Sequence, residues 1–302
     1  MRRTVVLLAL GCLACGGGGP GGRLLVGATH TLEDSGLLDV LLTAYDSTDP
    51  GLDVQVIVAG SGEILQYGRR GDLDMLIAHA PDDEARFMDE GHGVDRRVVM
   101  WNEFVLLTPP SDPAGVVGVA DVVEAFRAVA RSGAPFVSRG DLSGTHQREL
   151  ALWDSAGARP APDVYLEAGA GMADALRVAS TRHAYILSDV ATFTVLQPEL
   201  DLAIASRGDP RLLNVYSVMR VARGRNAEAA RRLADWLTGD GARAVITGFG
   251  TEGGRPRLFN PGPPPAAEAG LRSGDARARA RSVLNAGTVS ARRRTAAAPP
   301  PS

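Results

Sequence analysis

The sequence predicts an α/β fold with two lobes, each a mostly parallel sheet flanked by helices, and a ligand cleft between the lobes. Two observations lead to this prediction. Between residues 23 and 262, short apolar runs of strand length alternate with amphipathic runs of helical period. Such an alternation favours parallel strands covered by helices. It also passes through two rounds, and the first ends with a strand that stops before Pro109 and Pro110.

The first round predicts the sheet and helices of one lobe. Strands are expected at 24–28, 53–59, 74–78 and 104–107, and helices at 34–49, 63–70 and 81–90. The helix at 34–49 is amphipathic because its leucines share one face, at Leu37, Leu38, Leu41 and Leu42. Pro81 stands at the start of the helix at 81–90, where its missing N–H leaves no hydrogen bond unmade.

The second round predicts a second lobe and a return of the chain to the first. Strands are expected at 136–138, 164–167, 184–187 and 202–205, and helices at 119–131, 145–156, 172–180 and 190–196. A strand at 214–221 then leads back, and helices at 227–237 and 241–249 complete the fold. With crossings near 102–107 and 214–218, the first lobe is expected at 23–103 plus 214–262 and the second at 104–213. This is the plan of a type II-like periplasmic binding protein.

The two ends of the chain are expected to lie outside this fold. Residues 1–15 combine a basic start with an apolar stretch too short to span a bilayer, and they end in Cys15. A Gly-rich spacer at 16–22 follows. This arrangement resembles a bacterial lipoprotein signal peptide acylated at Cys15, with Cys12 as the alternative, and a simple cleaved secretory signal is the other interpretation. The Pro/Ala/Arg-rich segment 263–302 predicts a disordered tail.

These features predict an exported protein, in the periplasm or lipid-anchored at the outer face of the cytoplasmic membrane. Cys12 and Cys15 are the only cysteines, so the folded body can form neither a disulfide framework nor a thiol metal site. The net charge of −3 gives no indication of a nucleic-acid partner. A monomer without a cofactor is expected.

Catalysis is a poor interpretation of the polar residues. Asp141, Ser143 and His146 lie within one loop and one helical turn, and no nucleophile elbow or separate base is visible. The remaining histidines lack the spacing of metal ligands such as H-E-x-x-H. The sequence therefore favours a binding protein over an enzyme.

Four loops between a strand and a helix carry small hydroxyl or glycine residues, at 28–36, 59–62, 138–146 and 167–172. In open α/β sheets, ligands bind where strands end and helices begin. Free N–H groups and the helix dipole favour an anion at such places. The alternative is structural, because Ser, Thr and Asp also cap helices and Gly is common in turns.

Several longer segments resemble the tungstate-binding proteins of bacterial ABC importers. They are SGLLDVLL at 35–42, GDLDMLIAHAP at 71–81, EGHGVDRR at 90–97, GAPFVSRGDLSGTHQRELALW at 133–153 and GDPRLLNVYSV at 208–218. The resemblance implies a solute-binding component that closes on a tetrahedral oxyanion and delivers it to an ABC permease in the membrane. Tungstate is the expected ligand. Molybdate, sulfate or phosphate, and a relative that binds no anion, remain alternatives.

The resemblance also assigns ligand-binding residues in the first loop. The family normally has Ala-Thr-Thr-Thr-Ser there, and Thr29 and Thr31 match it. His30 replaces a threonine and is expected to donate to the anion in its place, with a helix cap or a rim residue as the alternative. Leu32 replaces the serine, so a hydroxyl donor is expected to be missing at that position.

In the other three loops the resemblance assigns the ligand to Ser61, Arg139, Ser143, Thr145 and Gly171. Arg139 is the expected charged clamp, since its planar guanidinium can reach two oxygens at once. The alternative for Arg139 is a salt bridge to Asp141. The fourth loop departs from the family pattern, because Ala170 and Ala173 stand where the family often has Gln and Gly.

Overall fold

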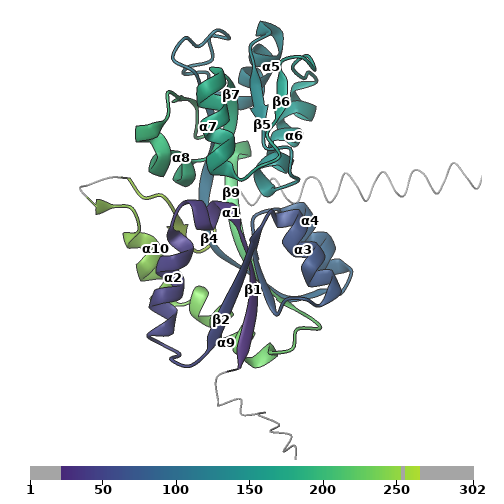
Figure 1. Cartoon of the computed structure of the whole chain (residues 1–302), viewed down its shortest axis with the longest axis vertical. Helices are drawn as coiled ribbons and strands as arrows, with labels where there is room; N and C mark the ends of the chain where they lie inside the picture. Colours follow the sequence, from purple (N-terminus) through teal and green to yellow (C-terminus); the bar gives the residue numbers. More distant parts are fainter. Residues whose placement is uncertain (1–21, 253–255, 266–302) are drawn as a thin grey trace, which may run out of the picture.

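The computed structural model describes residues 22–252 and 256–265 of the chain. Within these ranges, helices and strands build two lobes that are stacked along the long axis of the molecule (Figure 1). The predicted signal peptide with Cys12 and Cys15, nearly all of the spacer, and most of the predicted tail lie outside the described residues. No helix in the described ranges is long and apolar enough to cross a membrane.

The first lobe holds both the start and the end of the described chain. It contains β1 (Arg23–Thr29), α1 (His30–Asp34), α2 (Leu37–Asp46), β2 (Asp53–Ala59), α3 (Ser61–Arg70), β3 (Met75–Ala78), α4 (Pro81–Asp89), most of β4 (Gly93–Thr108), β9 (Leu213–Val221), α9 (Ala227–Leu237), α10 (Asp240–Gly248) and β10 (Asn260–Pro261). β1 is parallel to β2 and β3. Helices α2, α9 and α10 cover one face of this sheet, and α3 and α4 cover the other (Figure 1).

The second lobe repeats this architecture. It contains α5 (Val122–Ser132), β5 (Phe136–Ser138), α6 (Gly144–Ala156), β6 (Tyr165–Glu167), α7 (Met172–Arg182), β7 (Tyr185–Asp189), α8 (Val190–Leu196) and β8 (Ala203–Ser206), with short 3₁₀ turns at Gln197–Glu199 and Pro210–Leu212. β5 is parallel to β6 and β7. Helices α5 and α6 pack on one face and α7 and α8 on the other. The predicted class, two helix-flanked α/β lobes, is confirmed.

β4 is the structural link between the lobes. Its residues up to Glu103 pair with β9, whereas Phe104 and the residues after it pair with β7. The hinge strands β4 and β9 are antiparallel to each other and to their other neighbours, so parallel pairing is confined to strands that lead into helices. The sequence predicted only 104–107 as strand. Asp95, at φ 58°, lies where the register shifts, and such a bulge interrupts the alternation on which the prediction relied.

The predicted helix at 34–49 corresponds to α2 at Leu37–Asp46, and the five residues of α1, His30–Asp34, lie in the segment expected to be a loop. Gly36 adopts the left-handed conformation at φ 79°, and it separates the five-residue α1 from α2. Only glycine takes this conformation without a steric penalty. The break allows α1 to begin directly after β1, which places Thr29 and Thr31 at the carboxyl end of that strand.

Glu149 is a buried carboxyl group in the middle of α6, the helix that follows the SRGDLSGTH segment. Its Oε1 accepts hydrogen bonds from Trp153 Nε1 at 3.0 Å and from the Tyr165 hydroxyl at 2.6 Å. Burial raises the pKa of Glu149 to about 7, although these hydrogen bonds act in the opposite direction. The folded protein therefore favours the protonated form of this group.

We expect the substitution Glu149→Gln to flatten the pH dependence of stability. The carboxyl ionises near 4.5 when unperturbed, so between about pH 4.5 and 7 the folded state binds more protons than the unfolded state. Stability from this group is present at low pH and is lost as the pH rises through the folded-state pKa. The loss is about 3 kcal/mol in the wild type and should be absent in the variant.

Denaturant titrations at pH 5, 6, 7 and 8 measure this difference, and Asp46→Asn, at an exposed carboxylate, is the control. A Glu149→Gln curve parallel to that of the wild type would contradict the raised pKa.

Candidate anion-binding site

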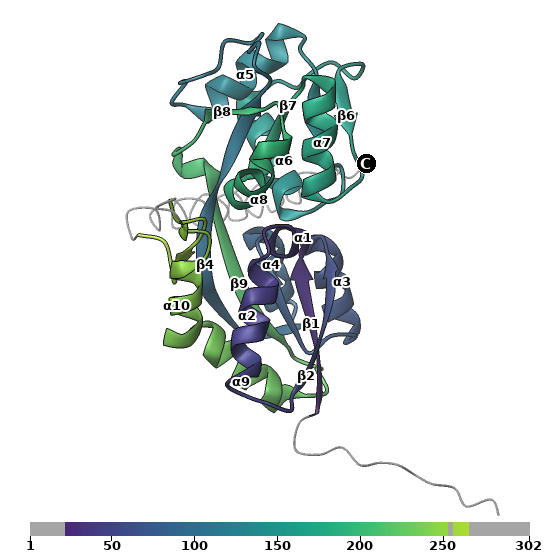
Figure 2. The same cartoon turned by 60° about the vertical axis from the view of Figure 1, so that its left-hand side comes forward.

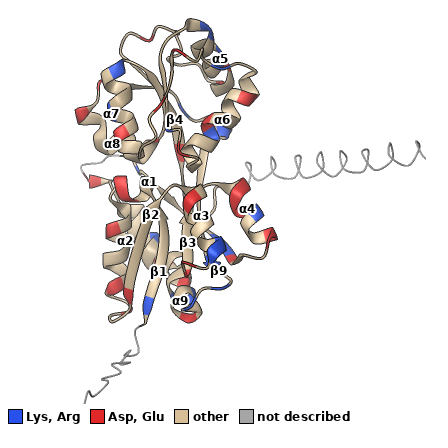
Figure 3. Cartoon of the chain, turned by 45° about the vertical axis from the view of Figure 1, so that its right-hand side comes forward, with Lys and Arg blue, Asp and Glu red and all other residues tan. Residues whose placement is uncertain are grey.

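Arg139 follows β5 and is the only arginine classed as buried among the described residues, with 2% of its surface exposed. Charged residues of both signs are otherwise interspersed over the outer helices of both lobes (Figure 3). The guanidinium pairs with the carboxylate of Asp141, so the salt bridge that was the alternative role for Arg139 is present. However, its buried Nε has no hydrogen-bond partner among the described residues. Arg139 thus retains one donor for something other than Asp141.

The start of α6 supplies a second free donor. The Oγ1 of Thr145 is buried and has no hydrogen-bond partner within the part of the chain that the structure describes. Ser143 is the helix cap, and its Oγ accepts a hydrogen bond from the backbone N–H of His146 at 3.3 Å. Helix capping, the alternative role for hydroxyl residues in these loops, therefore applies to Ser143 and not to Thr145. Because α6 has 13 residues, its N-terminal dipole also favours negative charge next to Thr145.

Asp141 remains ionised beside Arg139. Burial alone would raise its pKa, but the charge of Arg139 and the hydrogen bonds from Ser143 outweigh burial and lower the pKa below its usual value. The Arg139–Asp141 pair is therefore close to neutral overall. The local preference for an anion must come mainly from oriented donors and not from net charge.

On the first lobe, the hydroxyls of Thr29 and Thr31 lie 3.2 Å apart and are both buried. Thr29 is the residue before α1, yet its side chain makes no capping hydrogen bond. Ser61 begins α3, and its buried Oγ accepts a 3.4 Å hydrogen bond from the backbone N–H of His79. The two threonine hydroxyls are thus not consumed by helix capping.

The remaining positions of the first and fourth loops differ in role. His30 is only partly buried, with its Nδ1 3.9 Å from Glu33 Oε2, so it lies at the rim. Leu32 is fully buried in the core of the first lobe. The Leu32 side chain therefore belongs to the core and supplies no donor to the site. Gly171 precedes α7, and a Cβ atom there would lie 4.0 Å from His30 Cγ.

The two lobes meet at these loops, as the position of α1 and α3 beneath the second lobe indicates (Figure 2). A Cβ on Gly60 would lie 3.6 Å from the Cα of Ser143. On the other side, the carboxylate of Asp34 accepts a 3.2 Å hydrogen bond from the N–H of Ala173, across the junction. The predicted ligand-binding loops, which are far apart in the sequence, thus lie on the two lobe surfaces that face each other.

Asp189 is a buried group at this junction that sequence reasoning missed. Its Oδ1 caps α8 by accepting from the backbone N–H of Thr192 at 2.9 Å, while Oδ2 has no partner in the described ranges. Burial raises its pKa to about 6, and the charge of Arg139 lowers it. The positive charge of Arg139 therefore acts on the ionisation of the Asp189 carboxyl group. The only sequence signal was an Asp between a strand and a helix, which is equally typical of an ordinary cap.

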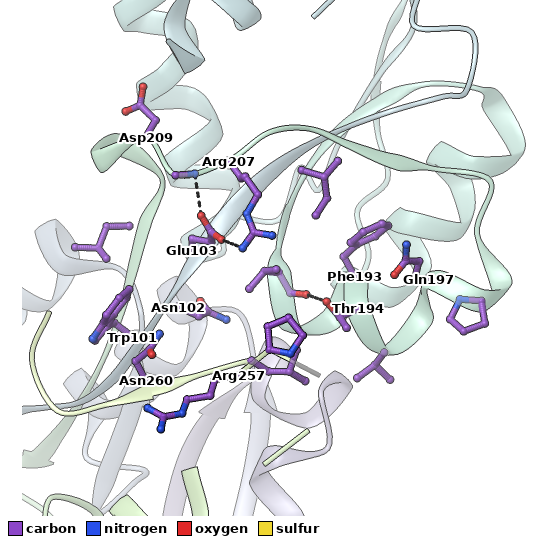
Figure 4. Close-up of a pocket in the computed structure, with 18 residues that line it drawn as sticks. Trp101, Asn102, Glu103, Phe193, Thr194, Gln197, Arg207, Asp209, Arg257 and Asn260 are labelled. Carbon is purple, nitrogen blue, oxygen red and sulfur yellow. Dashed lines mark hydrogen bonds and ion pairs between the residues drawn. The ribbon is translucent and has the colours of Figure 1, made fainter. Parts of the chain in front are cut away.

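A cavity of about 750 Å³ opens elsewhere, between α8 and the segment 256–260 (Figure 4). Trp101, Phe193 and Arg257 contribute to its wall, and Glu103 forms an ion pair with Arg207 at its edge. None of the predicted ligand-binding residues lines it. Because its walls come from both lobes and from β4, it is a groove beside the hinge.

Comparisons with known proteins define the family. Residues 17–241 match the family described as PBP superfamily domain. The tungstate-binding protein TupA of Peptoclostridium acidaminophilum is 36% identical over 246 residues, which are 80% of this chain and 86% of that protein. The chain belongs to the family of tungstate-binding proteins.

Two solved structures support this membership. The tungstate ABC transporter structure from Geobacter sulfurreducens is 38% identical, with a TM-score of 0.66, and the match covers 74% of this chain and 97% of that one. The tungstate-binding protein TupA from Desulfovibrio alaskensis G20 is 32% identical with the same TM-score of 0.66, and the match covers 81% and 100%. The fold is thus that of a tungstate-binding family member.

We expect Gly144→Ala to hold the lobes of this family member apart. A Cβ on Gly144 would lie 2.6 Å from the carbonyl oxygen of His79 on the first lobe, closer than real Cβ contacts. Each lobe should still fold, because alanine is favourable at a helical position. Small-angle X-ray scattering should therefore show a larger radius of gyration for the variant.

The control is Gly248→Ala, at a helical glycine of α10 whose added Cβ would meet nothing within 4 Å. Equal radii of gyration for wild type and Gly144→Ala would show that the lobes can approach without this close contact.

Proposed function

We propose that the chain is the solute-binding component of an ABC importer that holds a tetrahedral oxyanion, tungstate, between its lobes. The observation that carries the proposal is the pair of buried donors without a protein partner, Arg139 Nε and Thr145 Oγ1, where the lobes meet. Buried polar groups in folded proteins are nearly always hydrogen-bonded, so two such donors in one loop favour a ligand that accepts from both.

The chemistry of the site suits a tetrahedral dianion. Such an ion has four acceptor oxygens and no donor, and this site offers donors from two lobes. The hydroxyls of Thr29 and Thr31 come from the first lobe, and Arg139 and Thr145 come from the second. The N-terminal N–H groups of α6 add a favourable field without a further charge.

Lobe closure is the proposed binding step. The hydrogen bond between Asp34 and Ala173 joins α1 to the start of α7, and therefore forms only when the lobes are together. An anion that accepts from donors of both lobes would favour the same closed form. The closed protein would then present the anion to an ABC permease.

The relatives named for tungstate binding favour tungstate as the ligand. Molybdate has the same shape and charge, so we expect it to compete. We further propose that the protein is exported, monomeric and not an enzyme. Lipid anchoring through Cys15, or Cys12, would hold it at the outer face of the cytoplasmic membrane.

Thermal and denaturant unfolding of the purified chain test this proposal with tungstate, molybdate, sulfate and phosphate in turn. Tungstate at about 100 times its dissociation constant should raise the free energy of unfolding by about 2.7 kcal/mol. The substitution Arg139→Ala should remove this increase, whereas Arg159→Ala, at an exposed arginine paired with Asp154, should keep it. No stabilisation by any of the four anions would contradict the proposed function.

The substitution Thr145→Val separates ligand binding from stability. Because Thr145 Oγ1 makes no hydrogen bond within the protein, the anion-free variant should unfold at or above the wild-type temperature. Its tungstate affinity should fall about tenfold, the result of one lost hydrogen bond to the anion. Isothermal titration calorimetry measures this loss.

Thr181→Val, at an exposed threonine of α7, is the matched control. If Thr145→Val binds tungstate as tightly as the wild type does, Thr145 is not a ligand.

A further inference from the structure

A chain of buried hydrogen bonds connects the hinge strands to the threonine pair. His79 Nδ1 lies 2.9 Å from Asn214 Oδ1. Asn214 Nδ2 donates to Asn102 Oδ1 at 2.8 Å and to the Tyr216 hydroxyl at 3.0 Å. Tyr216 in turn donates to Thr31 Oγ1 at 3.2 Å. All five side chains are buried, so water does not compete for these bonds.

The amide of Asn214 gives this chain a direction. Both Nδ2 protons are used, one towards Asn102 and one towards Tyr216, so Oδ1 must face His79. Burial lowers the pKa of His79 to about 4, and the neutral ring therefore carries a single N–H. In this orientation of the amide, a neutral His79 that carries its proton on Nδ1 is the matching donor to the Asn214 oxygen.

The same direction of hydrogen-bond donation continues from Asn214 through Tyr216 to Thr31. The Tyr216 oxygen accepts from Asn214, which directs its own proton to Thr31 Oγ1. Burial and the negative charge of Asp189 keep the pKa of Tyr216 far above its usual value, so the hydroxyl keeps that proton. Thr31 Oγ1 accepts the hydrogen bond from Tyr216. The hydroxyl proton of Thr31 is therefore not donated to Tyr216.

A proton count gives the consequence. Thr29 and Thr31 have two hydroxyl protons, and the bond between their oxygens uses one of them. The other proton has no acceptor among the hydrogen bonds of the described residues. If the chain ran in the opposite direction, Thr31 would donate to Tyr216 and Thr29 to Thr31, and no proton would remain.

We propose that Tyr216 and Asn214 are positioning residues that make the threonine pair a donor to the bound anion. The proposal rests on the proposed function, since it assumes an oxyanion between the lobes. It adds a selectivity rule: this side of the site favours tetrahedral dianions whose oxygens carry no proton, and it disfavours protonated ones such as hydrogen phosphate.

Calorimetry on Tyr216→Phe in the full chain tests the rule with tungstate and phosphate at pH 7, where phosphate retains a proton. The ring and its stacking on His79, at 4.9 Å between centroids, are preserved by the substitution. Without the Tyr216 hydroxyl, Thr31 accepts no hydrogen bond from that side and becomes a weaker donor, so tungstate affinity should fall several-fold, while phosphate affinity should stay unchanged or rise. Tyr45→Phe, at a buried tyrosine that bonds Asp49, should change neither.

A double-mutant cycle with Thr31→Val shows whether the effect of Tyr216→Phe on tungstate affinity depends on the hydrogen bond from Tyr216 to Thr31. Tyr216→Phe should change tungstate affinity by less than about twofold in the Thr31→Val background, since Tyr216 then has no threonine to direct. A loss in that background as large as in the wild-type background, or an equal loss for tungstate and phosphate, would show a purely structural role and overturn the inference.

The wild-type titration separates this inference from the function on which it rests. A wild-type chain that does not bind tungstate contradicts the proposed function itself. A wild-type chain that binds tungstate, with Tyr216→Phe binding it equally well, overturns the positioning role alone. Thermal unfolding of each anion-free variant confirms that the compared proteins are folded.

Discussion

The need to satisfy buried donors where the lobes meet governs this structure. Arg139 is almost fully enclosed, and its only side-chain partner among the residues that the structure describes is the carboxylate of Asp141. Burying an ion pair carries a large desolvation cost, and the Nε of Arg139 and the Oγ1 of Thr145 remain without partners. A closed protein alone therefore leaves part of the desolvation cost uncompensated. An anion that accepts from both groups would offset it, which links closure to binding.

Close approach of the lobes depends on small residues at the contact points. A Cβ on Gly144 would lie 2.6 Å from the His79 carbonyl oxygen of the first lobe, whereas a Cβ on Gly60 would be in ordinary contact with Ser143 at 3.6 Å. The missing Cβ of Gly144 allows backbone and helix ends to face one another, which is the arrangement that anion binding requires. The hinge makes this approach possible, because β4 is shared by both lobes and one continuous strand carries the chain between them.

The polar residues of the hinge are also connected to the site. Asn102 and Asn214 face each other across β4 and β9, and the same hydrogen bonds continue through Tyr216 to Thr31. Hinge geometry and the direction of a ligand-facing hydroxyl are therefore parts of one network. Neighbouring groups in such a network do not contribute independently, so their substitutions are not expected to be additive.

Helix and strand periods in the sequence determined the two-lobed α/β class and most elements to within a few residues. Local conformations that depend on neighbours were not predictable. Leu142, for example, has φ 56° in the loop after Arg139, a conformation that no propensity assigns to leucine. The break at Gly36 and the bulge at Asp95 belong to the same class of feature. Sequence periods report which face is apolar, and they do not report where the backbone leaves regular geometry.

For the site, the sequence by itself identified the loops that carry Thr29, Ser61, Arg139 and Thr145, because small hydroxyl and glycine residues follow strands there. Only the tertiary structure decided the role of each side chain. It placed Leu32 in the core, used Ser143 as a helix cap, left Thr145 without a partner and brought His79, Asn214 and Tyr216 behind the threonines. The reason is physical: a hydrogen-bond partner far away in the chain is a property of packing, and local sequence patterns contain no record of it.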